Sequence, residues 1–192
     1  MATTSPAARL PWTGDPEADA LISTDANALL IGFALDQQVT VQKAFSGPLE
    51  LRRRLGHLDP ARIATTDPGE LERVFRERPA LHRFPGAMAK RVQALCAFIA
   101  ERYDGDGGRV WKDAGSAAEL RARLAELPGM GDMKVRSLIA TIVKRYDVRP
   151  PGYEAELPGH PTLGDVDTPE ALAAYQAAKR AHKAAMREAA GR

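Results

Sequence analysis

The sequence predicts an all-α fold. Helix-forming Ala, Leu, Arg and Glu recur throughout the 192 residues, and aromatic residues make up only 6% of them. Apolar residues repeat at helical spacing in several segments, whereas no alternating strand pattern of useful length occurs. This length suits a single compact unit, or two small lobes, that can bury a real core.

The N-terminal quarter is expected to hold a loose arm and three helices. The first dozen residues are interpreted as the arm, and Asp15-Pro16 opens a short helix. Asp25 can cap a second helix over residues 26–43, which carries an apolar face. Pro48 is expected to start the third helix.

The middle of the chain carries clear start signals. Asp67-Pro68-Gly69-Glu70 combines an N-cap, a proline at the first helical position and an acid at the third. This helix is expected to stop at Arg78-Pro79. Phe84-Pro85-Gly86 is a predicted turn before a long helix, and residues 104–108 form a polar loop.

The C-terminal half is predicted to contain three further helices. Ser116 caps the first of them, with Glu119 in the capping-box position. After a tight turn at residues 127–131, the next helix repeats apolar residues with helical period. Residues 149–164 are rich in Pro and Gly and predict an irregular loop, and a last helix follows over residues 168–189.

Charge and cysteine content limit the function classes. The net charge of +2 and the pI of 8.8 permit a nucleic-acid partner, provided that the basic residues are suitably placed. The single cysteine, Cys96, excludes an internal disulfide and a four-thiolate metal or iron–sulfur site within the chain. The N-terminus does not resemble a signal peptide, and the longest apolar run, residues 29–35, is too short to span a bilayer. A cytoplasmic protein is expected.

The strongest local signal is a helical hairpin whose turn is Leu127-Pro128-Gly129-Met130-Gly131. Its glycines allow a sharp turn and a close approach of the backbone to a ligand. The turn opens into a helix N-terminus, which favours an anion, and Lys134 and Arg136 add positive charge. A DNA phosphate is the natural anion. The alternative is an ordinary helix–helix turn with a glycine C-cap.

Three motifs together resemble a known family. They are residues 29–40 (L-L-I-G-F-A-L-D-Q-Q-V-T), residues 84–91 (F-P-G-A-M-A-K-R) and residues 127–136 (L-P-G-M-G-D-M-K-V-R). In this order they resemble the helix-hairpin-helix (HhH-GPD) superfamily of base-excision DNA glycosylases, over roughly residues 27–146. The resemblance implies a two-lobed helical fold with a cleft that receives a flipped base, followed by cleavage of the N-glycosidic bond. One lobe would span residues 26–146 and the other would combine residues 1–25 and 147–192.

The resemblance also guides the choice of catalytic residues. Bifunctional members carry a lysine where this chain has Met133, and the next residue, Lys134, points about 100° away on a helix. A monofunctional, water-dependent glycosylase is therefore expected. The family's aspartate is best matched by Asp167, which could equally be the N-cap of the last helix. Asp165 and Asp36 are the alternative acids.

Several further residues are candidates for DNA contact. Gln37 and Gln38 could hydrogen-bond base edges or wedge into the duplex, or they could be a solvated helix end. Lys90 and Arg91 could contribute to a basic rim, or to a solvated face. The same applies to Lys144 and Arg145.

The four histidines lack ligand spacing, so no transition metal is assigned. The resemblance implies instead a structural monovalent cation on backbone carbonyls near Ala125, Leu127 and Met130, and no iron–sulfur cluster. The expected partner is double-stranded DNA containing a damaged base. The protein would act as a monomer, away from membranes and associated with the nucleoid. A non-catalytic helix-hairpin-helix DNA-binding protein is the alternative function.

Overall fold

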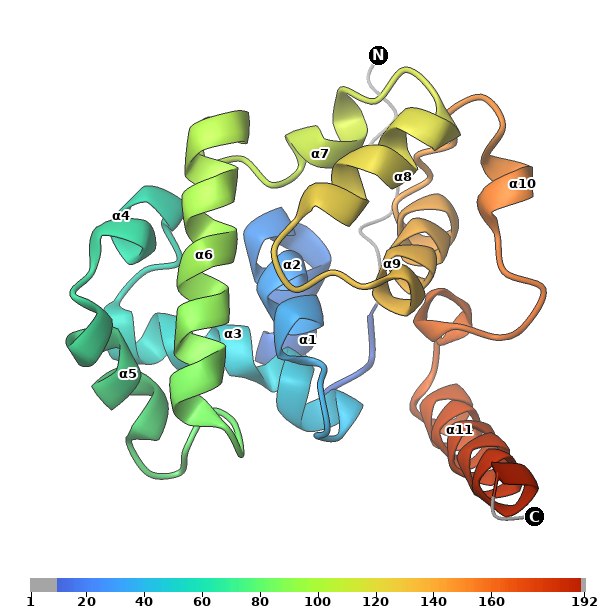
Figure 1. The fold of residues 1–192 in the computed structure, drawn as a ribbon, viewed down its shortest axis with the longest axis horizontal. Coiled ribbons are helices and arrows are strands. Elements are labelled where there is room, and N and C mark those ends of the chain that lie inside the picture. The colour runs from blue at the N-terminus through green and yellow to red at the C-terminus, as the bar shows by residue number, and fades with distance from the viewer. Residues whose placement is uncertain (1–9, 191–192) are drawn as a thin grey trace.

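The computed structural model describes residues 10–190, and in that range it consists of helices and loops without a strand (Figure 1). The predicted all-α class is confirmed. The elements are α1 (Pro16–Thr24), α2 (Ala26–Leu35), α3 (Val41–Leu55), α4 (Pro60–Thr65), α5 (Pro68–Arg76), α6 (Pro85–Tyr103), α7 (Arg109–Lys112), α8 (Ala117–Glu126), α9 (Asp132–Arg145), α10 (Tyr153–Glu156), the 3-10 turn η1 (Leu163–Asp165) and α11 (Pro169–Ala190).

Helices α1 to α6 form an N-terminal group. The long helix α6 packs against α4 and α5 on one side and against α2 on the other (Figure 1). Every residue of α2 from Ala28 to Leu35 is buried, because α1, α3 and α6 all pack on it. An added Cβ on Gly32 would lie 2.5 Å from the Phe45 ring of α3, so the two helices approach closely at this glycine.

Helices α7 to α11 and η1 form a C-terminal group. Helix α9 packs against α8 and, along its other side, against η1. A Cβ on Gly164 of η1 would come within 2.5 Å of the Ala140 carbonyl carbon, so backbone meets backbone at this point. The side chain of Arg145 fixes the same contact, because its Nε donates to the Gly164 carbonyl at 2.9 Å.

One continuous hydrophobic core runs through both groups. Two long-range hydrogen bonds join them near the start of the described chain: Trp12 Nε1 donates to the Val166 carbonyl at 3.3 Å, and Tyr146 donates to the Ile22 carbonyl at 2.8 Å. The helix contacts nevertheless place α1 with α2 and α3. The predicted division, in which residues 1–25 join residues 147–192, stays a prediction: α1 packs on its sequence neighbours, while the two hydrogen bonds tie its segment to Tyr146 and Val166.

The predicted helix starts are confirmed at three caps. The side chains of Asp25, Asp67 and Ser116 accept hydrogen bonds from the backbone N–H groups of Ala28, Glu70 and Glu119 at 3.1, 2.9 and 3.2 Å. Each bond satisfies a donor that a helix N-terminus leaves without a partner. The Asp67-Pro68 start of α5 and the Pro85 start of α6 also lie where the sequence predicts them.

The predicted helix over residues 26–43 is wrong. Helix α2 ends at Leu35, and Thr40 caps a new helix, α3, by accepting from the Lys43 N–H at 3.2 Å. Pro48 lies inside α3 instead of starting a helix. A proline there costs about 3 kcal/mol, and burial of the apolar residues around it offsets this cost.

Two further predictions need correction. The segment 149–164 holds α10 and the start of η1 and is not wholly irregular. Residues 1–9 of the predicted arm lie outside the described residues, but Leu10 and Trp12 are only 1% and 0% exposed and belong to the core.

Within residues 10–190 no single helix is long and apolar enough to cross a membrane; α1 and α2 would qualify only as a pair bent by 112°.

Candidate nucleic-acid interface

The predicted hairpin consists of α8, a turn at residues 127–131 and α9. Leu127 and Met130 anchor the turn in the core, with exposures of 2% and 7%, and the Met130 N–H donates to the Leu127 carbonyl at 3.1 Å. Because these two residues point inward, the glycines between and after them lie on the exposed side of the turn. The backbone of the turn is therefore accessible from outside.

The two glycines of the turn have different roles. Gly129 has a φ of +84°, and an added Cβ would lie 2.6 Å from the Arg91 side chain, so the fold itself requires a glycine there. Gly131 has an ordinary φ of −79°, and a Cβ there would meet nothing within 4 Å. Gly131 is the N-cap residue of α9, and no side chain caps this helix. Neither backbone strain nor packing thus requires a glycine at 131, and the free N–H groups at the start of α9 are open to an anion.

The charged residues of α9 point in two directions. Arg136 is exposed and pairs with Asp132 at 2.8 Å, and Asp132 also pairs with Arg121. Met133 is 69% exposed. Lys134 is half-buried instead, and its Nζ lies 3.3 Å from the carbonyl oxygens of both Ala34 and Gly129. Lys134 therefore points from the hairpin toward the C-terminal end of α2.

The loop between α2 and α3 meets Lys134 there. This loop carries Asp36, Gln37 and Gln38, directly after the end of α2 at Leu35. Both glutamine side chains are exposed, and Gln38 has a φ of +56°. The Arg91 guanidinium of α6 donates to the Gln37 side-chain oxygen. Lys90, next to Arg91, is exposed on α6.

A buried histidine, which the sequence analysis did not single out, holds this loop. His82 is 1% exposed; its Nδ1 accepts from the Phe84 N–H at 3.0 Å, so its Nε2 carries the proton and donates to the Gln37 carbonyl at 3.0 Å. Burial lowers the pKa of His82 below its ordinary value, against the opposing effect of its backbone hydrogen bonds. His82 is therefore neutral near pH 7 and keeps the backbone of Gln37 in place.

Asp36 is the predicted acid nearest to the hairpin. It is half-buried, and burial raises its pKa, while the positive charges of Lys179 and Lys134 oppose that rise. Burial in turn lowers the pKa of Lys134 to about 8, which the charge of Asp36 counteracts. The structure thus brings Asp36, Gln37, Arg91 and Lys134 together from one loop and two helices.

The other two predicted acids lie at η1 and the start of α11. Asp165 accepts hydrogen bonds from the N–H and hydroxyl groups of Thr162 at 2.8 and 3.0 Å and pairs with Lys144. Burial raises the pKa of Asp165, but these bonds outweigh it and hold the pKa below its ordinary value. Asp167 is exposed, and the predicted N-cap there is wrong: Thr168 caps α11 by accepting from the Ala171 N–H at 3.1 Å. A threonine directly before Pro169 is a favourable cap, which explains the difference of one residue.

The predicted cation ligands lie at the end of α8. Ala125 is in its last turn, where helix carbonyls lack intrahelical partners, whereas the Leu127 carbonyl accepts from the Met130 N–H. Carbonyl oxygens can hold a monovalent cation, and the cation at these residues stays a prediction from the resemblance. Among the described residues, no group of three or more His, Cys, Asp or Glu side chains is arranged to hold a metal ion.

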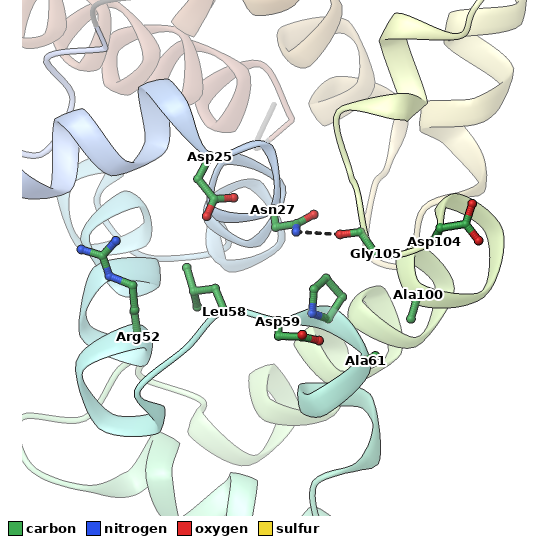
Figure 2. A pocket seen from close by; sticks show the side chains of 10 residues that line it. Asp25, Asn27, Arg52, Leu58, Asp59, Ala61, Ala100, Asp104 and Gly105 are labelled. Atoms are coloured by element: carbon green, nitrogen blue, oxygen red, sulfur yellow. Dashed lines mark hydrogen bonds between the residues drawn. The ribbon is translucent and has the colours of Figure 1, made fainter.

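Two cavities lie apart from these residues. The larger, of about 640 Å³, lies between the starts of α2 and α4 and the end of α6 (Figure 2). Its acids serve the fold, because Asp25 and Asp59 cap helices and Asp104 pairs with Arg109. Asn27 closes one side by donating to the Gly105 carbonyl at 2.9 Å (Figure 2). A second cavity, of about 210 Å³, lies between α3 and the segment at Pro79.

Comparison of the chain with protein-family models, with curated proteins and with solved structures found no match.

Proposed function

We propose that this protein binds duplex DNA through the hairpin of α8 and α9. The observation that carries the proposal is the surroundings of Gly131. A Cβ on this residue would meet nothing within 4 Å, and no side chain caps the start of α9, which Gly131 precedes. A residue without a side chain at this place lets a phosphate reach the backbone N–H groups. Because such contacts involve only phosphates, the binding would be independent of sequence.

Among DNA-binding proteins, we propose that this one is a monofunctional DNA glycosylase that removes a damaged or mismatched base. The resemblance to the HhH-GPD superfamily supports it, as does the place of Asp36, a half-buried acid at the loop that Lys134 of the hairpin helix contacts. Cleavage of a glycosidic bond passes through an oxocarbenium-like sugar. A carboxylate beside that sugar stabilises its positive charge and can orient a water molecule.

Asp36 is the best placed of the three candidate acids. The carboxylate of Asp165 is engaged by Thr162 and Lys144, and Asp167 is exposed at a helix start. Met133 stands where a lysine nucleophile is expected, so hydrolysis by water remains the proposed reaction. The finer fold proposal is that the N-terminal and C-terminal groups act as two lobes, with the flipped base received between them. A monovalent cation near Ala125, Leu127 and Met130 would neutralise part of a bound phosphate's charge.

A non-catalytic DNA-binding protein is the second candidate. The positions of Asp165 and Asp167 favour it, because the carboxylate of Asp165 serves the fold and Asp167, which best matches the family's acid, faces solvent before the start of α11. Base release separates the two candidates. Duplexes that contain uracil, hypoxanthine, an alkylated purine or an oxidised guanine are incubated with the protein, and free base is measured. Release from one of them supports the glycosylase; binding without release from a panel of lesions supports the second candidate.

A further inference from the structure

Helix α11 brings a lysine to the group formed by Asp36 and Lys134. The first part of α11 is fixed to the rest of the protein, since Leu172 is 4% exposed and the Gln176 side chain donates to the Gln42 side chain of α3 at 2.8 Å. Tyr175 is half-buried beside Asp36, whose charge contributes to raising the pKa of this tyrosine after burial itself. One turn further, the Lys179 ammonium lies 5.8 Å from the Tyr175 ring centroid.

Positively charged side chains from three helices gather near Asp36 and Lys134. The cations whose charges act on Asp36 are Lys134 of α9 and Lys179 of α11. Arg91 of α6 meets Lys134 at the turn, because a Cβ on Gly129 would lie 2.6 Å from the Arg91 side chain and the Lys134 Nζ lies 3.3 Å from the Gly129 carbonyl oxygen. The neighbouring acids have other partners, because Asp132 pairs with Arg121 and Arg136, and Asp165 pairs with Lys144. Positive charge thus exceeds negative charge in this partly buried place.

Donors also remain for a ligand. Lys134 has three N–H donors and uses two on carbonyl oxygens, while Arg91 has five and places one of its nitrogens on Gln37. Cations held together at a site of reduced dielectric repel one another, and an anion that binds among them relieves that repulsion. A phosphate group, with several acceptor oxygens, matches such a set of donors.

We infer that Arg91, Lys134 and Lys179 together bind one phosphodiester group of the DNA, and that α11 is thus part of the DNA-binding surface. This inference rests on the proposed function, and it adds an element that lies outside the hairpin. The open start of α9 and the three cations are connected through Lys134 itself, whose Nζ reaches the Gly129 carbonyl of the turn. Two neighbouring anion sites suit a polymer of phosphates better than a single free ion.

Salt dependence of binding tests the inference. Duplex affinity is measured by fluorescence anisotropy over a range of salt concentrations for the wild type, for Arg91→Gln, Lys134→Gln and Lys179→Gln, and for the triple variant. If one phosphate is shared, the triple variant loses only about one unit of the slope of log K against log salt, since each neutralised phosphate contributes about 0.9. The combined loss of affinity is then smaller than the product of the three single losses.

The control is Arg180→Gln, which removes the same charge from the next, exposed position of α11. A loss through Arg180→Gln equal to that through Lys179→Gln overturns the shared site, as does a slope loss of about three units, which would mean three separate phosphates. Unchanged binding by Lys179→Gln also overturns it. Should Arg91→Gln or Lys134→Gln fail to fold, Lys179→Gln and its control still decide, because both residues are exposed.

Two outcomes separate this inference from its premises. A wild type that binds no duplex at all refutes the proposed function. A wild type that binds, with Lys179→Gln unaffected, refutes the shared phosphate site and leaves the proposed DNA binding standing. Inorganic phosphate is included as a competitor, and the expectation is that it displaces DNA no better than sulfate does; strong, selective displacement by inorganic phosphate would instead identify a site for the free anion.

Discussion

The Lys134 ammonium lies 3.3 Å from the Ala34 carbonyl oxygen, although the two residues are 100 positions apart in the chain. This contact joins α9, the second helix of the hairpin, to the last turn of the buried helix α2. It also places a lysine, whose pKa burial lowers to about 8, at the proposed DNA surface. DNA binding should therefore respond to pH in the range where this amine loses its proton.

The first prediction concerns this pH range. Duplex affinity should fall between pH 7 and 9 in the wild type, because Lys134 loses its charge, whereas Lys134→Arg should keep a flat profile since arginine stays protonated. Anisotropy titrations at constant salt measure both. The free energy of unfolding should instead rise from pH 8 to 10.5, because there the unfolded chain binds the proton that folded Lys134 has lost. Equal pH dependence of affinity in both proteins would refute the assignment to Lys134.

The second prediction compares the two glycines of the turn. Gly131→Ala should lower the melting temperature less than Gly129→Ala does, since its added Cβ meets nothing within 4 Å, but it should weaken duplex binding by obstructing the start of α9. Gly129→Ala should destabilise the protein, because its φ of +84° costs an alanine about 1–2 kcal/mol and Arg91 must also move. Thermal unfolding and anisotropy give the two readouts. If Gly131→Ala binds DNA as well as the wild type does, the hairpin is an ordinary helix–helix turn.

The third prediction concerns the acid. Asp36→Asn should lower base release by at least about 100-fold, as expected when a charge that stabilises the transition state is removed. Duplex affinity should stay the same or rise, because a negative charge near phosphates is lost. Asp167→Asn and Asp165→Asn are the matched comparisons, measured in single turnovers on whichever substrate the wild type cleaves. If Asp167→Asn loses activity and the other two variants keep it, Asp167 is the catalytic acid, as the family resemblance indicates, and Asp36 is not.

The fourth prediction tests the reaction type. With Met133 69% exposed at the position where a lysine nucleophile is expected, the protein should form no covalent adduct with DNA in the presence of borohydride. Denaturing gel electrophoresis after incubation with a cleavable duplex measures this. An adduct that disappears in Lys134→Arg would show that Lys134 reaches the sugar and that the enzyme is not monofunctional.

The fifth prediction concerns the contact of η1 with α9. Gly164→Ala should lower the free energy of unfolding by about 1–3 kcal/mol, because its Cβ would overlap the backbone at Ala140. Gly159→Ala is the control, since a Cβ there meets nothing within 4 Å. Denaturant titration of both variants provides the comparison. Equal stability of the two would mean that η1 is not seated on α9 as described.

Local signals explain what the sequence predicts well. Caps such as Asp25, Asp67 and Ser116 act within three residues, so each can be recognised without knowledge of the fold. The turn at residues 127–131 is equally local. By contrast, the loop after Leu35 is held by His82, which hydrogen-bonds the Gln37 carbonyl from 45 residues away. Sequence spacing carries no sign of such a contact.

The candidate site is predictable only in part, for the same reason. The residues Asp36, Gln37, Arg91 and Lys134 stand out by their type and motif, but their convergence depends on how α6, α9 and the loop pack. Tyr175 and Lys179 carry no motif at all, and only the docking of α11 brings them to Asp36. At Pro48 the local signal itself misleads. Proline usually marks a helix start, but Pro48 lies inside α3, whose surrounding residues are buried.

The hydrogen bonds of Trp12 to Val166 and of Tyr146 to Ile22 tie the start of the described chain to the group that carries the hairpin. Trp12 is fully buried and contacts the rings of Phe33 and Phe45, so the same residue belongs to both groups. We therefore expect that the hairpin does not fold on its own, because a fragment that begins after α6 would expose the surfaces that Trp12 and Ile22 cover. We therefore expect the N-terminal group and the hairpin to unfold in one cooperative transition.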